Sequence, residues 1–219
     1  MTQPIDLYFW PTPNGWKISI ALEEMGLPYK LRPLNIMKGE QFEPEFLKLS
    51  PNNRMPAIVD HDGPGGAPIS VFESGAILQY LGRKTGQFYP SEERARVAVD
   101  EWLMWQMAGL GPMNGQHGHF NMFAAETIPY AIERYTNEVK RLHGVMDKRL
   151  SESDYLAVDY SIADMACWPW VKSAEFFGFD LSDFLSLKAW IERVGARPKV
   201  QSGSMVGMEL RPPMPAKPE

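Results

Sequence analysis

Two polar residues stand where the first apolar run of the chain turns into an amphipathic helix. Residues 8–17 read YFWPTPNGWK, so that Thr12 and Asn14 fall in the turn itself. A hydroxyl or amide at a helix N-terminus can cap free backbone N–H groups, and the same terminus can stabilise an anion. From the pattern alone, capping by Thr12 or Asn14 with Pro13 near the first helical position is the simpler interpretation. The chemistry open to such a turn is the stabilisation of an anionic group.

The single cysteine, Cys167, limits the sulfur chemistry that the chain can perform by itself. One cysteine cannot form an internal disulfide, a CxxC redox pair or a cysteine-based zinc site. We interpret Cys167 as a buried small side chain rather than a reactive thiol. His117 and His119 stand two positions apart, but zinc sites use three or four protein ligands, and we predict no metal site. Any thiol chemistry here needs a sulfur from a ligand.

Composition and charge argue against two classes of protein, nucleic-acid binders and membrane proteins. The 219 residues include 44% hydrophobic residues and seven Trp, which is enough for two domains with packed cores. A net charge of -5 argues against a non-specific nucleic-acid binder, which needs clustered Lys and Arg. No basic leader precedes an apolar core, and no apolar run approaches the roughly 18 residues of a membrane span. We therefore expect a soluble, cytoplasmic protein that binds neither nucleic acid nor membranes.

The elements that position the turn alternate between strand and helix in the first part of the chain. The apolar run before the turn is typical of a buried strand, Pro33 places the next strand at a sheet edge, and the Gly/Pro-rich stretch after His61 favours an antiparallel hairpin. Together they predict the order β-α-β-α-β-β-α. The expected elements are a strand at 5–10, a helix ending at Gly26, a strand at 29–36, a short helix at 43–49, two strands between 55 and 74, and a helix from Ser74 to about 86.

From Ser91 onward the periodicity is helical and no strand is evident. Apolar residues step by three or four between Ile128 and Leu150, which predicts one long helix. The stretch SIAD, residues 161–164, is typical of a capping box, and Pro169 should kink the helix that it opens unless packing compensates. The second part is therefore predicted to be a bundle of helices, followed by an extended or disordered proline-rich tail.

This order of elements followed by an all-helical domain resembles the cytosolic glutathione transferases. Three stretches carry the resemblance: PNNRMPAIVD, FESGAILQYL and SIADMACWPW. Three others, PTPNGWK, GEQFEPEFLKLSPNN and TIPYAIERY, are similar to the bacterial Nu-class, or disulfide-bond oxidoreductase-type, subgroup, which is related to the yeast nitrogen-regulating prion protein. The resemblance implies a thioredoxin-like glutathione-binding domain at 1–87 and an all-α helical-bundle domain at 88–219 with a proline-rich tail from about 211. It also implies a homodimer.

The resemblance further implies that bound glutathione supplies the reacting sulfur at the first turn. It assigns the catalytic roles to Thr12 and Asn14, and Tyr8 ranks below them because it lies inside the expected strand. A thiol with a pKa of about 8.5 is only slightly ionised at neutral pH. The Thr12 hydroxyl, an Asn14 donor and the helix N-terminus suffice to lower that pKa without a cationic residue. The implied glutathione-binding residues are Asn14, Gln41, Asn53, Met55, Pro56, Glu73, Ser74 and Arg134.

Each implied ligand contact has a structural alternative. Glu73 is expected to bind the γ-glutamyl ammonium and Ser74 its carboxylate, although Ser74 is also explained as an ordinary N-cap. Met55, before a cis-Pro56, is expected to pair its backbone with the cysteinyl residue, whereas a trans proline is commoner. The remaining three, expected as donors to the ligand, are equally explained as solvated side chains: Gln41, Asn53 and Arg134.

Three functions remain open at this point. The first is a glutathione-dependent disulfide-bond reductase that acts on small disulfides, and the lone Cys167 fits it because no protein cysteine is needed. The second is a transferase that conjugates glutathione to small electrophiles, with the segment around His117 and His119 shaping the wall of the second-substrate pocket. The third is a non-catalytic, glutathione-binding regulatory protein.

Overall fold

The computed structural model describes residues 3–211, and these divide into two units. The first unit contains the residues up to Gln87 together with the segment 197–211, and the second runs from Phe88 to Ala196. The domain bounds implied by the resemblance placed 197–211 in the helical domain, whereas in the structure this segment groups with the first unit. The proline-rich tail that was expected from about 211 lies, apart from Arg211, outside the described residues.

The first unit contains a four-stranded sheet with strand order β2-β1-β3-β4. β1 and β2 are parallel, β3 is antiparallel to β1, and β4 is antiparallel to β3. The predicted thioredoxin-like order, the hairpin and the edge position of the strand that carries Pro33 are confirmed. The strands are β1 (Ile5–Phe9), β2 (Tyr29–Pro33), β3 (Ala57–Asp60) and β4 (Ile69–Phe72), and the helices are α1 (Pro13–Glu24), α2 (Pro44–Leu47), α3 (Ser74–Thr85) and α9 (Pro198–Met205).

Strand β1 delivers the chain to the turn before α1. Its side chains alternate, with Ile5, Leu7 and Phe9 buried and the two between them half-buried. Three residues separate Phe9 from the start of α1, and α1 packs against α3. Because α1 and α3 pack together, their N-terminal turns lie close to each other in the first unit.

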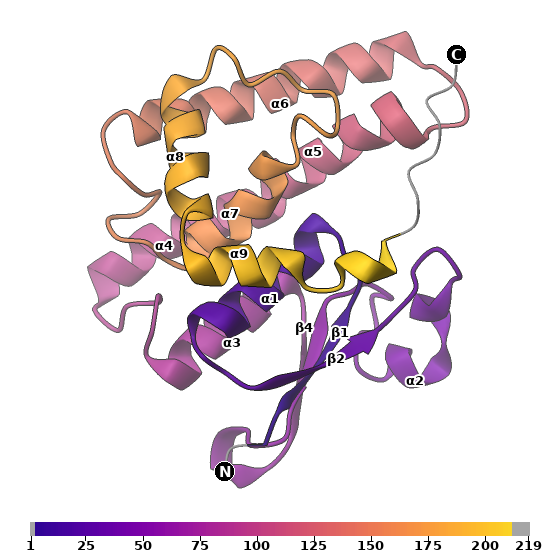
Figure 1. Cartoon of the computed structure of the whole chain (residues 1–219), viewed down its shortest axis with the longest axis vertical. Coiled ribbons are helices and arrows are strands. Elements are labelled where there is room, and N and C mark those ends of the chain that lie inside the picture. Colours follow the sequence, from indigo (N-terminus) through magenta and orange to yellow (C-terminus); the bar gives the residue numbers. More distant parts are fainter. Residues whose placement is uncertain (1–2, 212–219) are drawn as a thin grey trace. The chain divides into compact units, whose positions relative to one another are not determined.

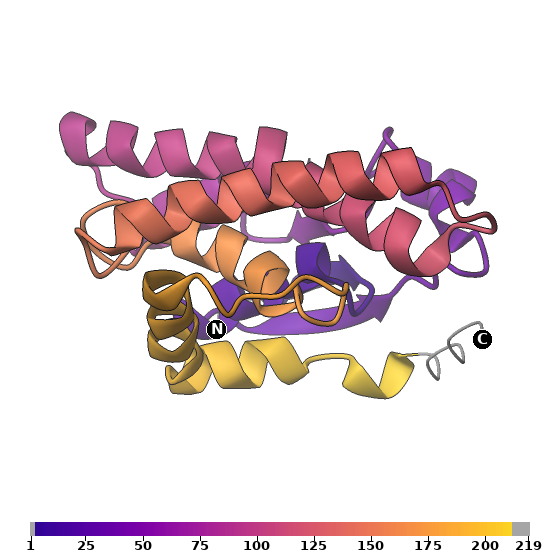
Figure 2. The ribbon, with the colours of Figure 1, turned by 90° about the horizontal axis from the view of Figure 1, so that it is seen from above.

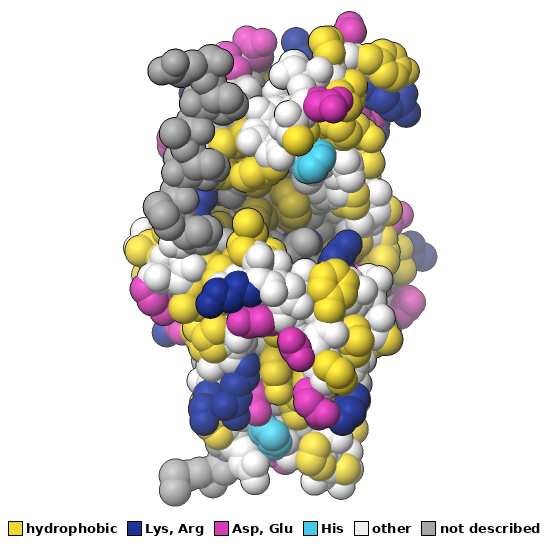
Figure 3. All heavy atoms as spheres, turned by 90° about the vertical axis from the view of Figure 1, so that its right-hand side faces the viewer, with side chains coloured by type: hydrophobic (Ala, Val, Ile, Leu, Met, Phe, Trp, Pro, Cys, Tyr) yellow, Lys and Arg dark blue, Asp and Glu magenta, His cyan; other side chains and the backbone are white. Residues whose placement is uncertain are grey.

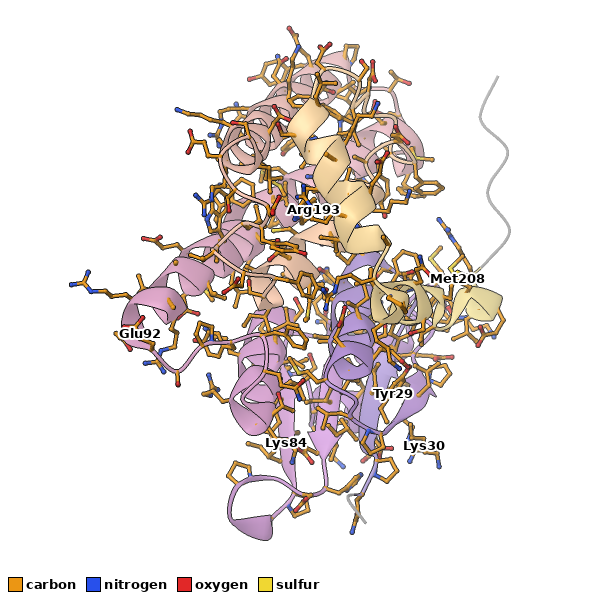
Figure 4. All side chains as sticks on the ribbon, turned by 60° about the vertical axis from the view of Figure 1, so that its left-hand side comes forward. Tyr29, Lys30, Lys84, Glu92, Arg193 and Met208 are labelled. Atoms are coloured by element: carbon orange, nitrogen blue, oxygen red, sulfur yellow. The ribbon has the colours of Figure 1, made fainter. Side chains whose placement is uncertain are left out.

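Helix α9 lies alongside α1, although the two are separated by most of the sequence (Figure 1). The Ser19 hydroxyl on α1 donates to the Gly203 carbonyl oxygen at 2.6 Å, and the Trp16 indole N–H donates to the Val206 carbonyl at 3.2 Å. A short helical turn that contains Met208 follows α9 (Figure 4). The C-terminal segment is thus built into the unit that carries the polar turn.

The second unit is helical throughout its described length. α6 is the long helix predicted from the apolar stripe, and it packs against α5 and α8 (Figure 2). The Ser161–Asp164 capping box is present as predicted, and its helix continues through a buried Pro169 to Lys172. The helices are α4 (Glu93–Trp105), α5 (Gly111–Gly118), α6 (Pro129–Leu150), α7 (Ile162–Lys172) and α8 (Leu185–Gly195), with π-helical turns at Gln106–Leu110 and His119–Phe123.

Surface charges are mixed on the face shown in Figure 3. Lys and Arg side chains there alternate with Asp and Glu, and the described residues form no continuous basic patch on that face. None of the helices within residues 3–211 combines the length and apolar character that a membrane span requires.

Candidate functional site

A pocket of about 170 Å³ lies in the first unit, where the start of α1, the segment before β3 and the start of α3 come together. It is lined by five of the residues predicted to bind glutathione and by two that were not predicted. Its lining residues are Asn14, Asn52, Arg54, Met55, Pro56, Glu73 and Ser74.

Thr12, beside this pocket, caps α1. Its backbone is extended, its hydroxyl oxygen accepts from the Gly15 N–H at 3.3 Å, and its carbonyl accepts from the Trp16 N–H. The capping interpretation is therefore confirmed. The Thr12 hydroxyl donates its hydrogen to the Met55 sulfur, with 3.9 Å between the Thr12 oxygen and the sulfur. Capping uses the oxygen alone, so the hydrogen remains available for a ligand once it turns from Met55.

Two helix N-termini reach the pocket, α1 through Asn14 and α3 through Ser74. Each helix is 12 residues long, and neither has an acidic residue in its first turn. The partial positive charge of each terminus is therefore not neutralised by its own helix. This part of the pocket favours an anion.

The Met55–Pro56 peptide bond is cis, as the resemblance implied. The bond leads directly into β3, and Met55 packs against a cluster formed by Leu34, Phe46 and Ala57. The Met55 sulfur also accepts a hydrogen bond from the Trp10 N–H at 3.2 Å. Packing and this hydrogen bond together fix Met55 beside the turn.

Glu73 adopts a backbone conformation that is rare for a side-chain-bearing residue. Its φ is 69° and its ψ 117°, and it directly precedes α3. Such a conformation costs about 1–3 kcal/mol, and residues that adopt it cluster at functional sites. The Asn52 side-chain amide donates to the Glu73 carboxylate at 3.5 Å. Glu73 is the acidic residue among those lining the pocket.

Ser74 is the first residue of α3 and is buried, with Glu73 rather than Ser74 at the N-cap position. The alternative that Ser74 is an ordinary N-cap is therefore wrong. Its hydroxyl oxygen accepts a hydrogen bond from the buried Lys17 ammonium at 3.3 Å.

Three of the predicted ligand residues do not line this pocket. Gln41 lies in the helical turn Glu40–Phe42, and its side-chain oxygen is buried without a hydrogen-bond partner among residues 3–211. Asn53 has a φ of 48°, and its amide oxygen accepts from Arg54. Arg134 is exposed on α6 in the second unit. Their binding roles stay predictions.

Asn52 and Arg54 line the pocket and were not predicted. The sequence feature that could have identified them is their position in the stretch NNRMP, just before the cis-proline. Polar residues in a loop are usually solvated, so only their position beside an expected binding segment distinguished these two.

His117, His119 and Cys167 belong to the second unit. Cys167 is buried on α7, as predicted. His117, expected on a pocket wall, is buried at the end of α5, where its Nδ1 lies 2.9 Å from the Asn121 amide nitrogen and 3.2 Å from the Thr136 hydroxyl. His119 is exposed and packs edge-on against Phe120. Across residues 3–211, no group of three or more His, Cys, Asp or Glu side chains is placed to hold a metal ion.

Comparison with known proteins identifies the family. The glutathione S-transferase N-terminal domain matches residues 3–83, and the C-terminal domain of the same name matches residues 122–198. The disulfide-bond oxidoreductase YfcG of Escherichia coli K12 is 56% identical over 196 residues, which cover 89% of this chain and 91% of that protein. The chain belongs to the glutathione S-transferase family. The resemblance inferred from the sequence is thereby confirmed.

Two solved structures of this family are also similar. The glutathione transferase of Pseudomonas putida is 43% identical with a TM-score of 0.88, over 93% of this chain and 91% of that one, and holds one glutathione disulfide per subunit. The Burkholderia graminis glutathione transferase is 43% identical with a TM-score of 0.90, over 93% and 88%, and holds two glutathione molecules per subunit.

Proposed function

We propose that this member of the glutathione S-transferase family binds glutathione and uses its thiolate to reduce small disulfides. The observation that carries the proposal is the pocket where Asn14 and Ser74 bring two helix N-termini together beside the Thr12 hydroxyl. The name of the E. coli relative and the glutathione disulfide bound by the P. putida relative support it.

The pocket has the groups needed to favour a thiolate. Lowering a thiol pKa by about two units takes about 2.7 kcal/mol of preferential stabilisation of the anion. One hydrogen bond to a charged group contributes roughly 1.5 to 3 kcal/mol, and a helix N-terminus adds to it. The Thr12 hydroxyl and an Asn14 donor therefore suffice, provided that the ligand sulfur lies near the start of α1.

The proposed reaction proceeds by two thiol–disulfide exchanges. In the first, the glutathione thiolate attacks one sulfur of the substrate disulfide; a new S–S bond forms, the substrate S–S bond breaks, and the leaving thiolate takes a proton. In the second, another glutathione thiolate attacks the glutathione sulfur of the mixed disulfide and releases the second substrate thiol. Two reduced glutathiones become one glutathione disulfide, and the substrate gains two electrons and two protons.

The remaining predicted contacts complete the proposed complex. Glu73 would bind the γ-glutamyl ammonium and Ser74 the carboxylate, while Met55 pairs its backbone with the cysteinyl residue. Gln41, Asn53 and Arg134 are assigned to the ligand by resemblance alone. A homodimer is likewise proposed from the family, and sedimentation equilibrium will measure it.

Replacing Thr12 with Val tests the proposed activation. Val keeps the shape and removes the hydroxyl, so we expect the pKa of bound glutathione to rise by about one unit. At about pH 5.5, below both pKa values, kcat/KM for a small disulfide should therefore fall about tenfold. Thiolate absorbance in the ultraviolet measures the pKa. Thr12→Ser keeps the hydroxyl and should stay within about threefold of wild type. A folded Thr12→Val/Asn14→Ala double variant with full activity would contradict the proposal.

Cys167→Ala separates the proposal from a mechanism that uses a protein thiol. Disulfide reduction should persist in this variant, because the reacting sulfur comes from the ligand. Conjugation to a chloronitroarene, assayed with the same preparation, tests the transferase alternative: a conjugation rate well above the reduction rate would favour it. A calorimetric titration without detectable glutathione binding would favour the non-catalytic alternative.

A further inference from the structure

A buried lysine contacts Ser74, one of the residues that line the pocket. Lys17 on α1 is only 2% exposed, and its ammonium donates to the Ser74 hydroxyl at 3.3 Å. Lys is almost never so completely buried in proteins unless its charge is satisfied, because removing an ammonium from water is costly. Lys17 also follows Asn14 by three residues, so the two lie on the same side of α1.

The chemistry of the two groups fixes the direction of their hydrogen bond. An ammonium only donates, so the Ser74 oxygen must be the acceptor, and its single hydrogen is left to be donated elsewhere. Ser74 lines the pocket, where α3 begins. A ligand acceptor in the pocket can therefore compete for the hydrogen bond that the Ser74 hydroxyl donates. Interaction with a cation also makes the hydroxyl a stronger donor.

The Lys17 ammonium also adds positive charge near the place proposed for the ligand's carboxylate. A positive charge buried beside the pocket is screened less than one in water, and it acts in the same sense as the α3 N-terminus. The Glu73 carboxylate, on the adjacent residue, carries the opposite charge. Together they match a carboxylate and an ammonium on a single carbon atom, as at the γ-glutamyl end of glutathione.

We infer that Lys17 is a positioning residue, which holds the Ser74 hydroxyl as a donor to the ligand's α-carboxylate and thereby selects thiols with a free γ-glutamyl end. This inference rests on the proposed binding of glutathione in the pocket. It assigns a functional role to a residue that touches the ligand only through Ser74.

The experiment compares two ligands across variants of the full chain. Glutathione is one, and 4-aminobutanoyl-cysteinylglycine, which keeps the ammonium and thiol but lacks the α-carboxylate, is the other. Calorimetry gives the ratio of their Kd values. Lys17→Met preserves length and removes the charge, so the ratio should fall about tenfold, through weaker binding of glutathione with unchanged binding of the analogue. In turnover, KM for glutathione should rise while kcat changes little.

Two further variants separate positioning from general damage. Ser19→Ala removes another buried polar group of α1, one that faces α9, and it should keep the wild-type ratio even if it lowers stability. In a Ser74→Ala background, Lys17→Met should change the ratio less than about twofold, because the group through which it acts is gone. Lys17→Leu, which also lacks a donor, replaces Lys17→Met if that variant does not fold.

The outcomes distinguish this inference from the proposed function. Wild-type protein that binds neither ligand would overturn both. Wild-type protein that binds glutathione, with an unchanged ratio in folded Lys17→Met or Lys17→Leu, would overturn the role of Lys17 alone. Equal weakening of both ligands would overturn it too, since it would show a structural effect.

Discussion

His143 on α6 is a buried titratable residue outside the pocket. It is 0% exposed, and neither ring nitrogen has a hydrogen-bond partner among residues 3–211. Its ring packs edge-on against Phe179, with centroids 4.8 Å apart, and against Phe184 at 6.0 Å. Burial lowers the pKa of His143 to about 4, and the neighbouring His117 adds to the shift because two positive charges repel. His143 is therefore neutral at pH 7.

This burial predicts a loss of stability in mild acid. The unfolded histidine, with a pKa of about 6.5, binds a proton more readily than the folded one, so the free energy of unfolding falls as pH drops from about 7 towards 4. Between pH 7 and 5 the loss is roughly 2 kcal/mol. His143→Leu should remove that part of the pH dependence, as measured by urea denaturation at both pH values. The exposed His119→Leu is the control; an equal change in both variants would contradict the assignment.

At the scale of elements, the contact between α1 and α9 depends on the absence of one side chain. A Cβ on Gly203 would lie 2.5 Å from the Ile20 Cα and 2.8 Å from its backbone nitrogen. Both atoms belong to the α1 backbone, which cannot move without moving the helix. The two helices therefore approach this closely only with glycine at this position.

Gly203→Ala should destabilise the protein by about 2 kcal/mol, because the added methyl group separates α9 from α1. Thermal denaturation measures the change. Gly144→Ala, within α6, is the matched control: its Cβ would be 4.0 Å from the nearest Phe184 atom, so helix propensity should make it neutral or stabilising by up to about 1 kcal/mol. Similar losses in both variants would show that α9 packing is not the cause.

At the scale of the whole molecule, the first unit is held together by an ion pair between its N-terminal part and the segment 197–211. Arg197 and Glu24, 173 positions apart, form two hydrogen bonds of 2.7 and 3.0 Å. The Glu24 side chain is 5% exposed and that of Arg197 32%. This pair joins the segment that precedes α9 to the end of α1.

Arg197→Gln should cost about 2 kcal/mol of stability, because it leaves the Glu24 carboxylate buried without this cation. Adding Glu24→Gln should restore part of the loss, and chemical denaturation of all four proteins gives the coupling between the two residues. Arg141 and Glu138 form a more exposed pair, with side chains 59% and 34% exposed, and provide the comparison: Arg141→Gln should change stability by less than about 1 kcal/mol. Equal effects at the Arg197–Glu24 pair and at the more exposed Arg141–Glu138 pair would argue against this role of the C-terminal segment.

Much of the fold followed from local patterns in the sequence. The apolar stripe of α6, the burial alternation of β1 and the Ser161–Asp164 capping box each depend on residues within a few positions of one another. The polar turn at Thr12 was visible for the same reason. Family resemblance then supplied the ligand and pointed to Met55, Pro56, Glu73 and Ser74, which periodicity alone could not have connected with Asn14.

Only the tertiary structure decided which distant residues share the site. The contact of Lys17 with Ser74, the presence of Asn52 and Arg54 at the pocket, and the return of residues 197–211 to the first unit all join segments far apart in the chain. Such contacts depend on how helices and strands pack in three dimensions, and no short-range period encodes them. The sequence by itself determined the elements and the chemistry available at the turn, because capping and periodic burial are local; the arrangement of charge around the pocket came from packing.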